Sequence, residues 1–185
     1  MAAPATAIEP TELDFAELYA AHHDGVRRTL VCLGVPEAIV DDALQEVFVV
    51  VHKRLDDPSQ YQSIKGWIYG IARRVAWRHH RSDARAKKKL ALVDPPRDDG
   101  TPESELARRE AIDFMHAFLD ALDDDQREVF VLSEIEGLSA PEIAMIVSAK
   151  LNTVYSRLRL ARGRFEQALA RRGARARREE VGRGQ

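Results

Sequence analysis

Hydrophobic residues recur every three to four positions along most of this chain, which is the period of amphipathic helices and not of strands. The Val-rich run at positions 47–51 contains many β-branched side chains, yet the length and period of its segment favour a helix. The pattern predicts helices over residues 11–32, 36–55, 64–83, 103–122, 124–135 and 141–147, and a last helix that begins at Leu151. The sequence therefore predicts an all-α fold.

The helical segments are divided by a stretch that has no hydrophobic period. Residues 94–102 are rich in Pro, Gly and Asp, a composition typical of a linker that does not fold alone. We therefore expect two small helical domains, at residues 11–86 and 105–170, joined by a flexible linker at 87–104. A basic tail at 171–185 is expected to fray, and turn residues predict a loop over 56–62.

Several predicted helix ends carry residues suited to capping. Short polar side chains accept hydrogen bonds from the first turn of a helix, and Gly adopts the left-handed backbone that ends one. The candidate N-caps are Thr11, Asp14, Ser63 and Asp123, and the candidate stops are Gly34 and Gly137.

The segment from Leu138 to Phe165 has the pattern of a helix-turn-helix. Ser139 followed by Glu142 is a capping box, and residues 148–150 form the turn between a short helix and a longer one. One side of the second helix is apolar. Its other side carries hydrogen-bonding and cationic groups: Asn152, Thr153, Tyr155, Ser156, Arg157, Arg159 and Arg162. Such groups meet base edges and phosphates in a major groove, and the alternative is a solvated helical hairpin.

The net charge of −2 hides two basic segments. Nine Lys or Arg residues stand against one acid in residues 64–89, and ten Arg stand against three Glu in residues 157–183. Either segment could contact a polyanion. The one cysteine, Cys32, excludes an internal disulfide and suits a reducing compartment. No signal peptide and no apolar run long enough to span a bilayer is recognisable, so we expect a cytoplasmic protein.

The helix predicted at residues 36–55 has an acidic face. Spacings of three and four place Asp41, Asp42, Gln45 and Glu46 on one surface. That surface is either a solvated helix face or a docking face for a basic protein partner.

In the helix predicted at residues 64–83, aromatic residues alternate with cations. The set comprises Trp67, Tyr69 and Trp77 with Lys65, Arg73, Arg74, Arg78 and Arg81. Aromatic rings stack on unpaired bases and cations attract phosphates, which is the chemistry of single-strand binding. Trp67 could equally belong to the core.

No candidate catalytic, cofactor or metal site emerges from the sequence. Adjacent residues on a helix point about 100° apart, so neither His22-His23 nor His79-His80 suits chelation. The chain has no phosphate-binding loop and no catalytic triad. We expect no enzymatic activity and no cofactor.

Two blocks of sequence resemble the extracytoplasmic-function (ECF) sigma factors of bacterial RNA polymerase, the type with two conserved domains. Residues 40–55 (VDDALQEVFVVVHKRL) and 64–81 (IKGWIYGIARRVAWRHHR) resemble the family's region 2. Residues 119–169, which contain the helix-turn-helix, resemble its region 4. The resemblance covers nearly the whole chain apart from the ends and the linker.

The resemblance implies a sigma factor that binds core polymerase through its β′ and β subunits, recognises the −10 and −35 promoter elements and aids melting. Polymerase docking would fall to Asp41, Asp42, Gln45 and Glu46. The −10 strand would meet the loop 56–62 and Trp67, Arg73, Arg74, Trp77, Arg78 and Arg81. The −35 element would be read by the seven polar residues of the last helix. An anti-sigma factor is a further expected partner, and catalysis would belong to the polymerase.

Three features depart from the family pattern. Leu122-Asp123 stands where many relatives have Leu-Pro, and Asn152 stands where Gly is common. Arg74 and Arg78 replace an Asn and an Asp, which should raise the positive potential over the −10 strand. The competing hypotheses are a helix-turn-helix regulator that binds duplex DNA without polymerase, and a scaffold whose basic faces bind anionic partners.

Overall fold

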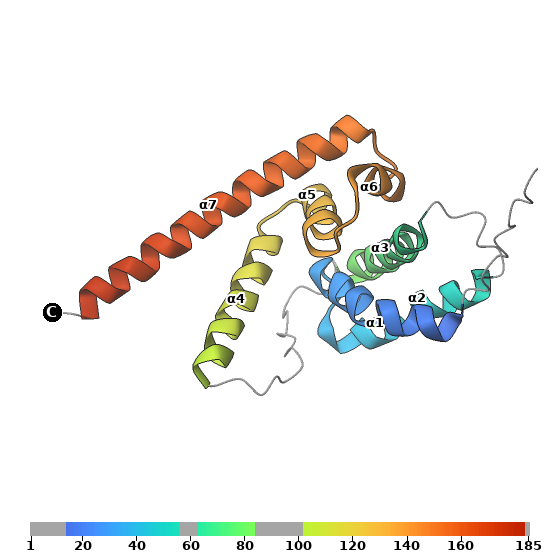
Figure 1. The fold of residues 1–185 in the computed structure, drawn as a ribbon, viewed down its shortest axis with the longest axis horizontal. Helices are drawn as coiled ribbons and strands as arrows, with labels where there is room; N and C mark the ends of the chain where they lie inside the picture. Colours follow the sequence, from blue (N-terminus) through green and yellow to red (C-terminus); the bar gives the residue numbers. More distant parts are fainter. Residues whose placement is uncertain (1–13, 56–62, 84–101, 184–185) are drawn as a thin grey trace, which may run out of the picture.

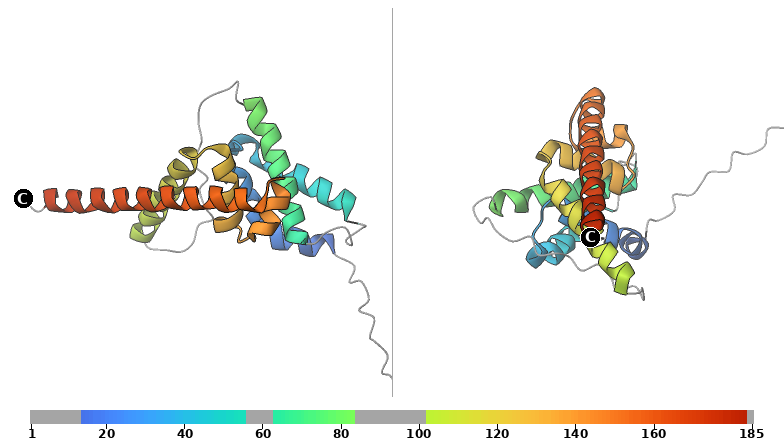
Figure 2. Two further views of the ribbon diagram at one scale, coloured as in Figure 1. Left: turned by 90° about the horizontal axis from the view of Figure 1, so that it is seen from above. Right: turned by 90° about the vertical axis from the view of Figure 1, so that its left-hand side faces the viewer.

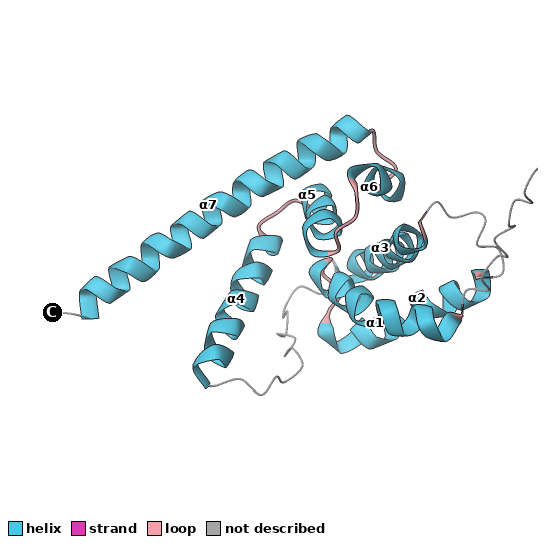
Figure 3. Ribbon diagram, viewed as in Figure 1, coloured by secondary structure: helices cyan, strands magenta, loops and turns pink. Residues whose placement is uncertain are grey.

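The computed structural model describes residues 14–55, 63–83 and 102–183, and every regular element in those ranges is a helix (Figures 1 and 3). An N-terminal unit contains α1 (Phe15–Cys32), α2 (Glu37–Arg54) and α3 (Ile64–Asp83). A C-terminal unit contains α4 (Pro102–Asp120), α5 (Asp124–Phe130), the π-helical segment η2 (Val131–Ile135), α6 (Ala140–Ile146) and α7 (Leu151–Arg183). The predicted all-α fold is confirmed.

The predicted caps that fall on described residues are confirmed. The side chains of Asp14, Ser63 and Asp123 each accept a hydrogen bond from a backbone N–H of the helix that follows. Ser139 and Glu142 form the predicted capping box, in which the Ser139 N–H lies 2.8 Å from Oε2 of Glu142. Gly34 and Gly137 have φ of 89° and 68°, which only a glycine adopts without strain. Thr11, the loop at 56–62 and most of the predicted linker lie outside the described residues.

The two units pack against each other, which the sequence did not predict. α1 contacts η2 and α3 contacts α6, so the N-terminal unit touches two elements of the C-terminal unit. Fully buried side chains from both units belong to one continuous apolar cluster, among them Leu30, Ile68, Leu132 and Ile143. Burial of apolar surface therefore stabilises the packing of the units as well as each unit alone.

Two parts of the C-terminal unit differ from expectation. The helix predicted over 124–135 is an α-helix only to Phe130 and continues as the π-helical segment η2. The tail that was expected to fray after Arg171 is instead the end of α7, which is helical to Arg183. Ala and Arg are strong helix formers, and they outweigh the cost of about 1 kcal/mol for each Gly in the helix. The C-terminal part of α7 extends past α4 and away from α1–α3 (Figures 1 and 2).

Candidate functional site

The helix-turn-helix presents one polar face to solvent. α6 ends at Ile146, and Ser148 takes a positive φ of 52° in the turn that leads to α7. Val154, Leu158 and Ala161 hold α7 against the unit's core. The exposed residues on the opposite face are Asn152, Tyr155, Ser156 and Arg159. Four of the seven predicted −35 residues thus share one open surface.

The remaining predicted −35 residues lie at the sides of this face. Arg157 forms an ion pair with Asp125 of α5, and the Nη2 atom of Arg162 lies 2.7 Å from Oε1 of Glu134. Thr153 is half-buried in the first turn of α7. The two acids fix both guanidinium groups beside the exposed face, where cations suit phosphates on either side of a groove.

Ion pairs divide the acidic face of α2 into two edges. Asp41 lies 3.2 Å from Nε of Arg27 on α1, whereas Glu46 pairs with Arg78 and His79 on α3. Asp42 and Gln45 are exposed. Charge reversal at Glu46 would therefore disturb the packing of α2 on α3 as well as any docking surface. A substitution at Asp42 therefore tests docking without disturbing the packing of α2 on α3.

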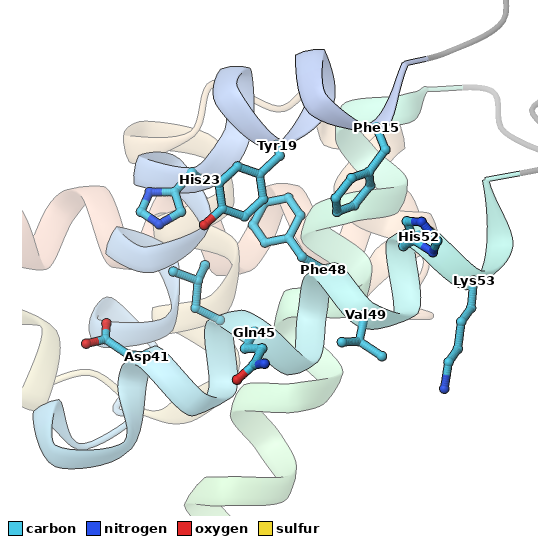
Figure 4. A pocket seen from close by; sticks show the side chains of 10 residues that line it. Phe15, Tyr19, His23, Asp41, Gln45, Phe48, Val49, His52 and Lys53 are labelled. Atoms are coloured by element: carbon cyan, nitrogen blue, oxygen red, sulfur yellow. The ribbon is translucent and has the colours of Figure 1, made fainter.

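An apolar groove of about 810 Å³ runs beside this face between α1 and α2 (Figure 4). The rings of Phe15, Tyr19 and Phe48 line it, with Asp41 towards one end and Lys53 at the other. An apolar surface bordered by polar and charged groups is the usual composition of a protein–protein interface. The surroundings of the acidic face thus favour docking over a merely solvated helix.

The predicted −10 residues of α3 occupy two strips of the helix. Arg73 and Trp77 face the C-terminal unit, with the guanidinium group 5.6 Å from the ring centre. Arg74 is exposed, and Arg78 extends to Glu46. Trp67 is half-buried and packs against the core, which agrees with the alternative considered for it. The side chain of Arg81 lies outside the described part.

Two carboxylates between the units were missed by the sequence analysis. The side chain of Glu136, 2 % exposed, lies 3.1 Å from Nη2 of Arg28, and it also accepts a hydrogen bond from Tyr69. Lys65 donates to the Glu136 backbone carbonyl at 2.5 Å. Burial, followed by the bond to Glu136, raises the pKa of Tyr69.

The second carboxylate belongs to Glu128, whose side chain is 4 % exposed. Its Oε2 lies 3.0 Å from Nε of Arg73, and its Oε1 accepts a hydrogen bond from the indole of Trp77. Burial raises the pKa of the Glu128 carboxyl, and Arg73 partly offsets that effect. The sequence held one signal for both acids: Glu128, Leu132 and Glu136 follow at intervals of four, so both acids continue an apolar stripe.

The described ranges contain no metal-binding cluster, since no group of three His, Cys, Asp or Glu residues there could hold a metal ion. None of the helices described is long and apolar enough to cross a membrane.

Comparison with known proteins places both units in one family. Residues 18–86 match the model of sigma-70 region 2, and residues 115–165 match that of sigma-70 region 4. The RNA polymerase sigma factor CnrH of Cupriavidus metallidurans is 30% identical over 166 residues, which cover 84% of this chain and 86% of that protein. The ferric citrate uptake sigma factor FecI of Escherichia coli is 28% identical, and the match covers 77% of this chain and 83% of FecI.

Solved structures agree with these matches. The structure of CnrH in complex with the cytosolic domain of CnrY has a TM-score of 0.64 at 26% identity, over 84% of this chain and 87% of that one. The sigma factor RpoE from Bartonella quintana, in complex with the anti-sigma factor NepR, shares the fold with a TM-score of 0.68 at 21% identity. The match covers 85% of this chain and 97% of RpoE. The chain therefore belongs to the ECF sigma factors, which bind core RNA polymerase and direct it to promoters. The hypothesis of a regulator that acts without polymerase is set aside.

Proposed function

We propose that α7 reads the −35 element through Asn152, Tyr155, Ser156 and Arg159, with Arg157 and Arg162 anchored on phosphates. The single observation that carries this assignment is the exposed polar face directly after the turn of a helix-turn-helix. Amide and guanidinium groups make paired hydrogen bonds to base edges in the major groove. In the same proposal, α3 and the loop at 56–62 receive the −10 strand.

The acidic face of α2 is the proposed contact with core polymerase. Asp42 and Gln45 are exposed there, next to the apolar groove between α1 and α2. The protein would act in the cytoplasm, where core polymerase works, and would contribute no catalysis of its own. An anti-sigma factor is a further proposed partner, because the similar sigma factor RpoE was crystallised with the anti-sigma factor NepR, and the structure of CnrH is that of a complex with the cytosolic domain of CnrY.

Run-off transcription with core polymerase on a genomic library tests the function and yields the promoters. On a promoter found this way, Asn152→Ala should relax the preference at one −35 position by on the order of 1–3 kcal/mol. Gln167→Ala removes an amide group from an exposed position further along α7, outside the helix-turn-helix, and should change nothing. Equal effects of the two variants on cognate and scrambled −35 DNA would contradict the assignment of the reading face.

Asp42→Lys tests the acidic face of α2 by co-purification with core polymerase. Charge reversal against a basic partner should weaken the complex, and more visibly at low salt. Undiminished binding by the folded variant would remove Asp42 from the interface.

A further inference from the structure

The exposed face of α7 continues past the polar residues that are assigned above to the −35 element. Leu160 follows Ser156 by one helical turn and Asn152 by two, so these three residues share one face of the helix. Leu160 is 52% exposed, whereas the adjacent Ala161 is fully buried. A leucine therefore stands among hydrogen-bonding and cationic groups, on the side of α7 that faces away from the core.

The place of Leu160 on the proposed reading face sets it apart from ordinary surface leucines. Single exposed apolar residues are common and need no ligand. The face that carries Leu160, however, is the one proposed to enter a major groove. Base pairs present mainly hydrogen-bonding groups in that groove, and the C5 methyl of thymine is their one apolar substituent. Contact with this methyl group is how a base pair would cover Leu160 with apolar surface.

Gly163, one turn after Leu160, is not explained by packing within the protein. Glycine is among the least favourable residues in a helix interior, and alanine is the most favourable. Beyond its sequence neighbours and the helix backbone, a Cβ built on Gly163 meets no described atom within 4 Å. The described part of the protein therefore has room for alanine at this position. What a glycine does provide is close approach of the helix backbone to a ligand.

The positions of the two residues along α7 match the dimensions of a major groove. At about 1.5 Å per residue, Leu160 lies roughly 12 Å from Asn152, which is about the width of the groove. Gly163 lies roughly 16 Å from Asn152, at the level of a sugar–phosphate wall that borders the groove. Arg162, which directly precedes Gly163, is assigned above to a phosphate. A DNA backbone at the level of Gly163 agrees with that assignment.

We propose that the −35 surface of α7 extends to Leu160 and Gly163. Leu160 packs against the C5 methyl of a thymine in the −35 element, and Gly163 lets the sugar–phosphate backbone approach the helix. This inference rests on the proposed function, because it adds two residues to the same reading face. It also gives the cognate promoters a required feature, which is a thymine at the −35 position that faces Leu160.

Replacement of thymine by uracil tests the first contact, because uracil lacks only the methyl group. Each thymine of a −35 element found by run-off transcription is replaced in turn, and promoter binding by the polymerase holoenzyme is measured. One replacement should weaken binding by wild type about fourfold, the factor that corresponds to ~0.8 kcal/mol for one buried methyl group. The same replacement should not affect Leu160→Ala. The matched control is Leu169→Ala, which removes an exposed leucine further along α7 and should keep the fourfold loss.

Alanine at Gly163 tests the second contact through two effects of opposite sign. Gly163→Ala should raise the melting temperature, since alanine favours the helix and its methyl group has room. It should also weaken promoter binding by the holoenzyme, because the same methyl group holds the DNA backbone away. The matched control is Gly173→Ala, whose new Cβ would lie at an ordinary 3.7 Å from Nη1 of Arg177. Gly173 lies roughly 31 Å along the helix from Asn152, so this variant should raise the melting temperature and leave promoter binding unchanged.

The outcomes separate these two contacts from the function on which they rest. Equal binding of wild type to every uracil-containing promoter, or an equal loss in wild type and Leu160→Ala, overturns the methyl contact. Unchanged promoter binding by Gly163→Ala overturns the close approach. Either result leaves the proposed function standing as long as Asn152→Ala still relaxes the preference at a −35 position. If neither Asn152→Ala nor Leu160→Ala changes any −35 preference, the proposed reading face is overturned together with its extension.

Discussion

Gly25, in the middle of α1, is a position where a single methyl group should disturb the contact between the units. A Cβ built there would lie 2.2 Å from Oη of Tyr69, a distance that real Cβ atoms do not show. It would also lie 3.3 Å from Oε2 of Glu136. Gly25→Ala must therefore push the Tyr69 hydroxyl away from the carboxylate that it hydrogen-bonds.

The expected cost of Gly25→Ala combines three contributions. Overpacking costs about 1–3 kcal/mol. Loss of the hydrogen bond to the Glu136 carboxylate costs about 1.5–3 kcal/mol. Replacing Gly by Ala within a helix returns about 1 kcal/mol. The variant should therefore be less stable than wild type by roughly 1.5–5 kcal/mol.

The Tyr69→Phe variant isolates the effect of the Tyr69 hydroxyl on this cost. Phe lacks the hydroxyl, and the ring carbon that carries it lies at an ordinary 3.5 Å from the new Cβ. In the Tyr69→Phe background Gly25→Ala should therefore be neutral or stabilise by up to ~1 kcal/mol. Urea unfolding of the four proteins at pH 7 measures the double-mutant cycle. An equal loss of stability in both backgrounds would show that the hydroxyl is not what confines Gly25.

Three further predictions follow from the capping box, the α2 edge and the recognition helix. Ser139→Ala should cost ~1 kcal/mol in urea unfolding. The hydrogen bond from Ser139 is also the largest cause that lowers the pKa of Glu142. The stabilisation from this bond is therefore fully present above the ordinary carboxyl pKa of ~4.3, and it is lost as the pH falls through the lower folded-state pKa. The difference in the free energy of unfolding between wild type and Ser139→Ala should therefore become smaller at acidic pH. Glu46→Lys should lower the melting temperature as well as polymerase binding, because Glu46 pairs with the cation Arg78 on α3, whereas Asp42→Lys should affect polymerase binding alone. Arg162→Ala should weaken cognate and scrambled −35 duplexes alike and reduce the slope of log affinity against log salt by about 1.

Local signals were sufficient to predict most helices. α3 begins and ends where expected, at Ile64 and Asp83, because Ser63 caps it and its apolar residues keep one period. The recognition helix begins at Leu151 as expected, although Leu151 itself is 39% exposed and lies outside the buried stripe. The π-helical segment was not predicted, since the apolar run around Val131 fits a π-helix and an α-helix equally well.

The contact between the units could not be predicted from the same signals. Glu136 continues the apolar stripe that includes Leu132, but its partners Arg28 and Lys65 are 108 and 71 positions away. Local periodicity carries no information about which distant cation a buried acid meets. Residues of the −35 face were easier to find, because their exposure follows from the stripe that buries Val154 and Leu158.

The length of α7 has a practical consequence for mass determination. Its 33 residues span about 50 Å at 1.5 Å per residue. A compact protein of this chain length has a radius of gyration of only about 16 Å, so the helix alone exceeds the diameter of the equivalent sphere. A monomer of 20.8 kDa should therefore elute early in gel filtration, at a volume that a spherical calibration assigns to a larger species. Light scattering or sedimentation equilibrium, which do not assume a shape, will distinguish such a monomer from a dimer.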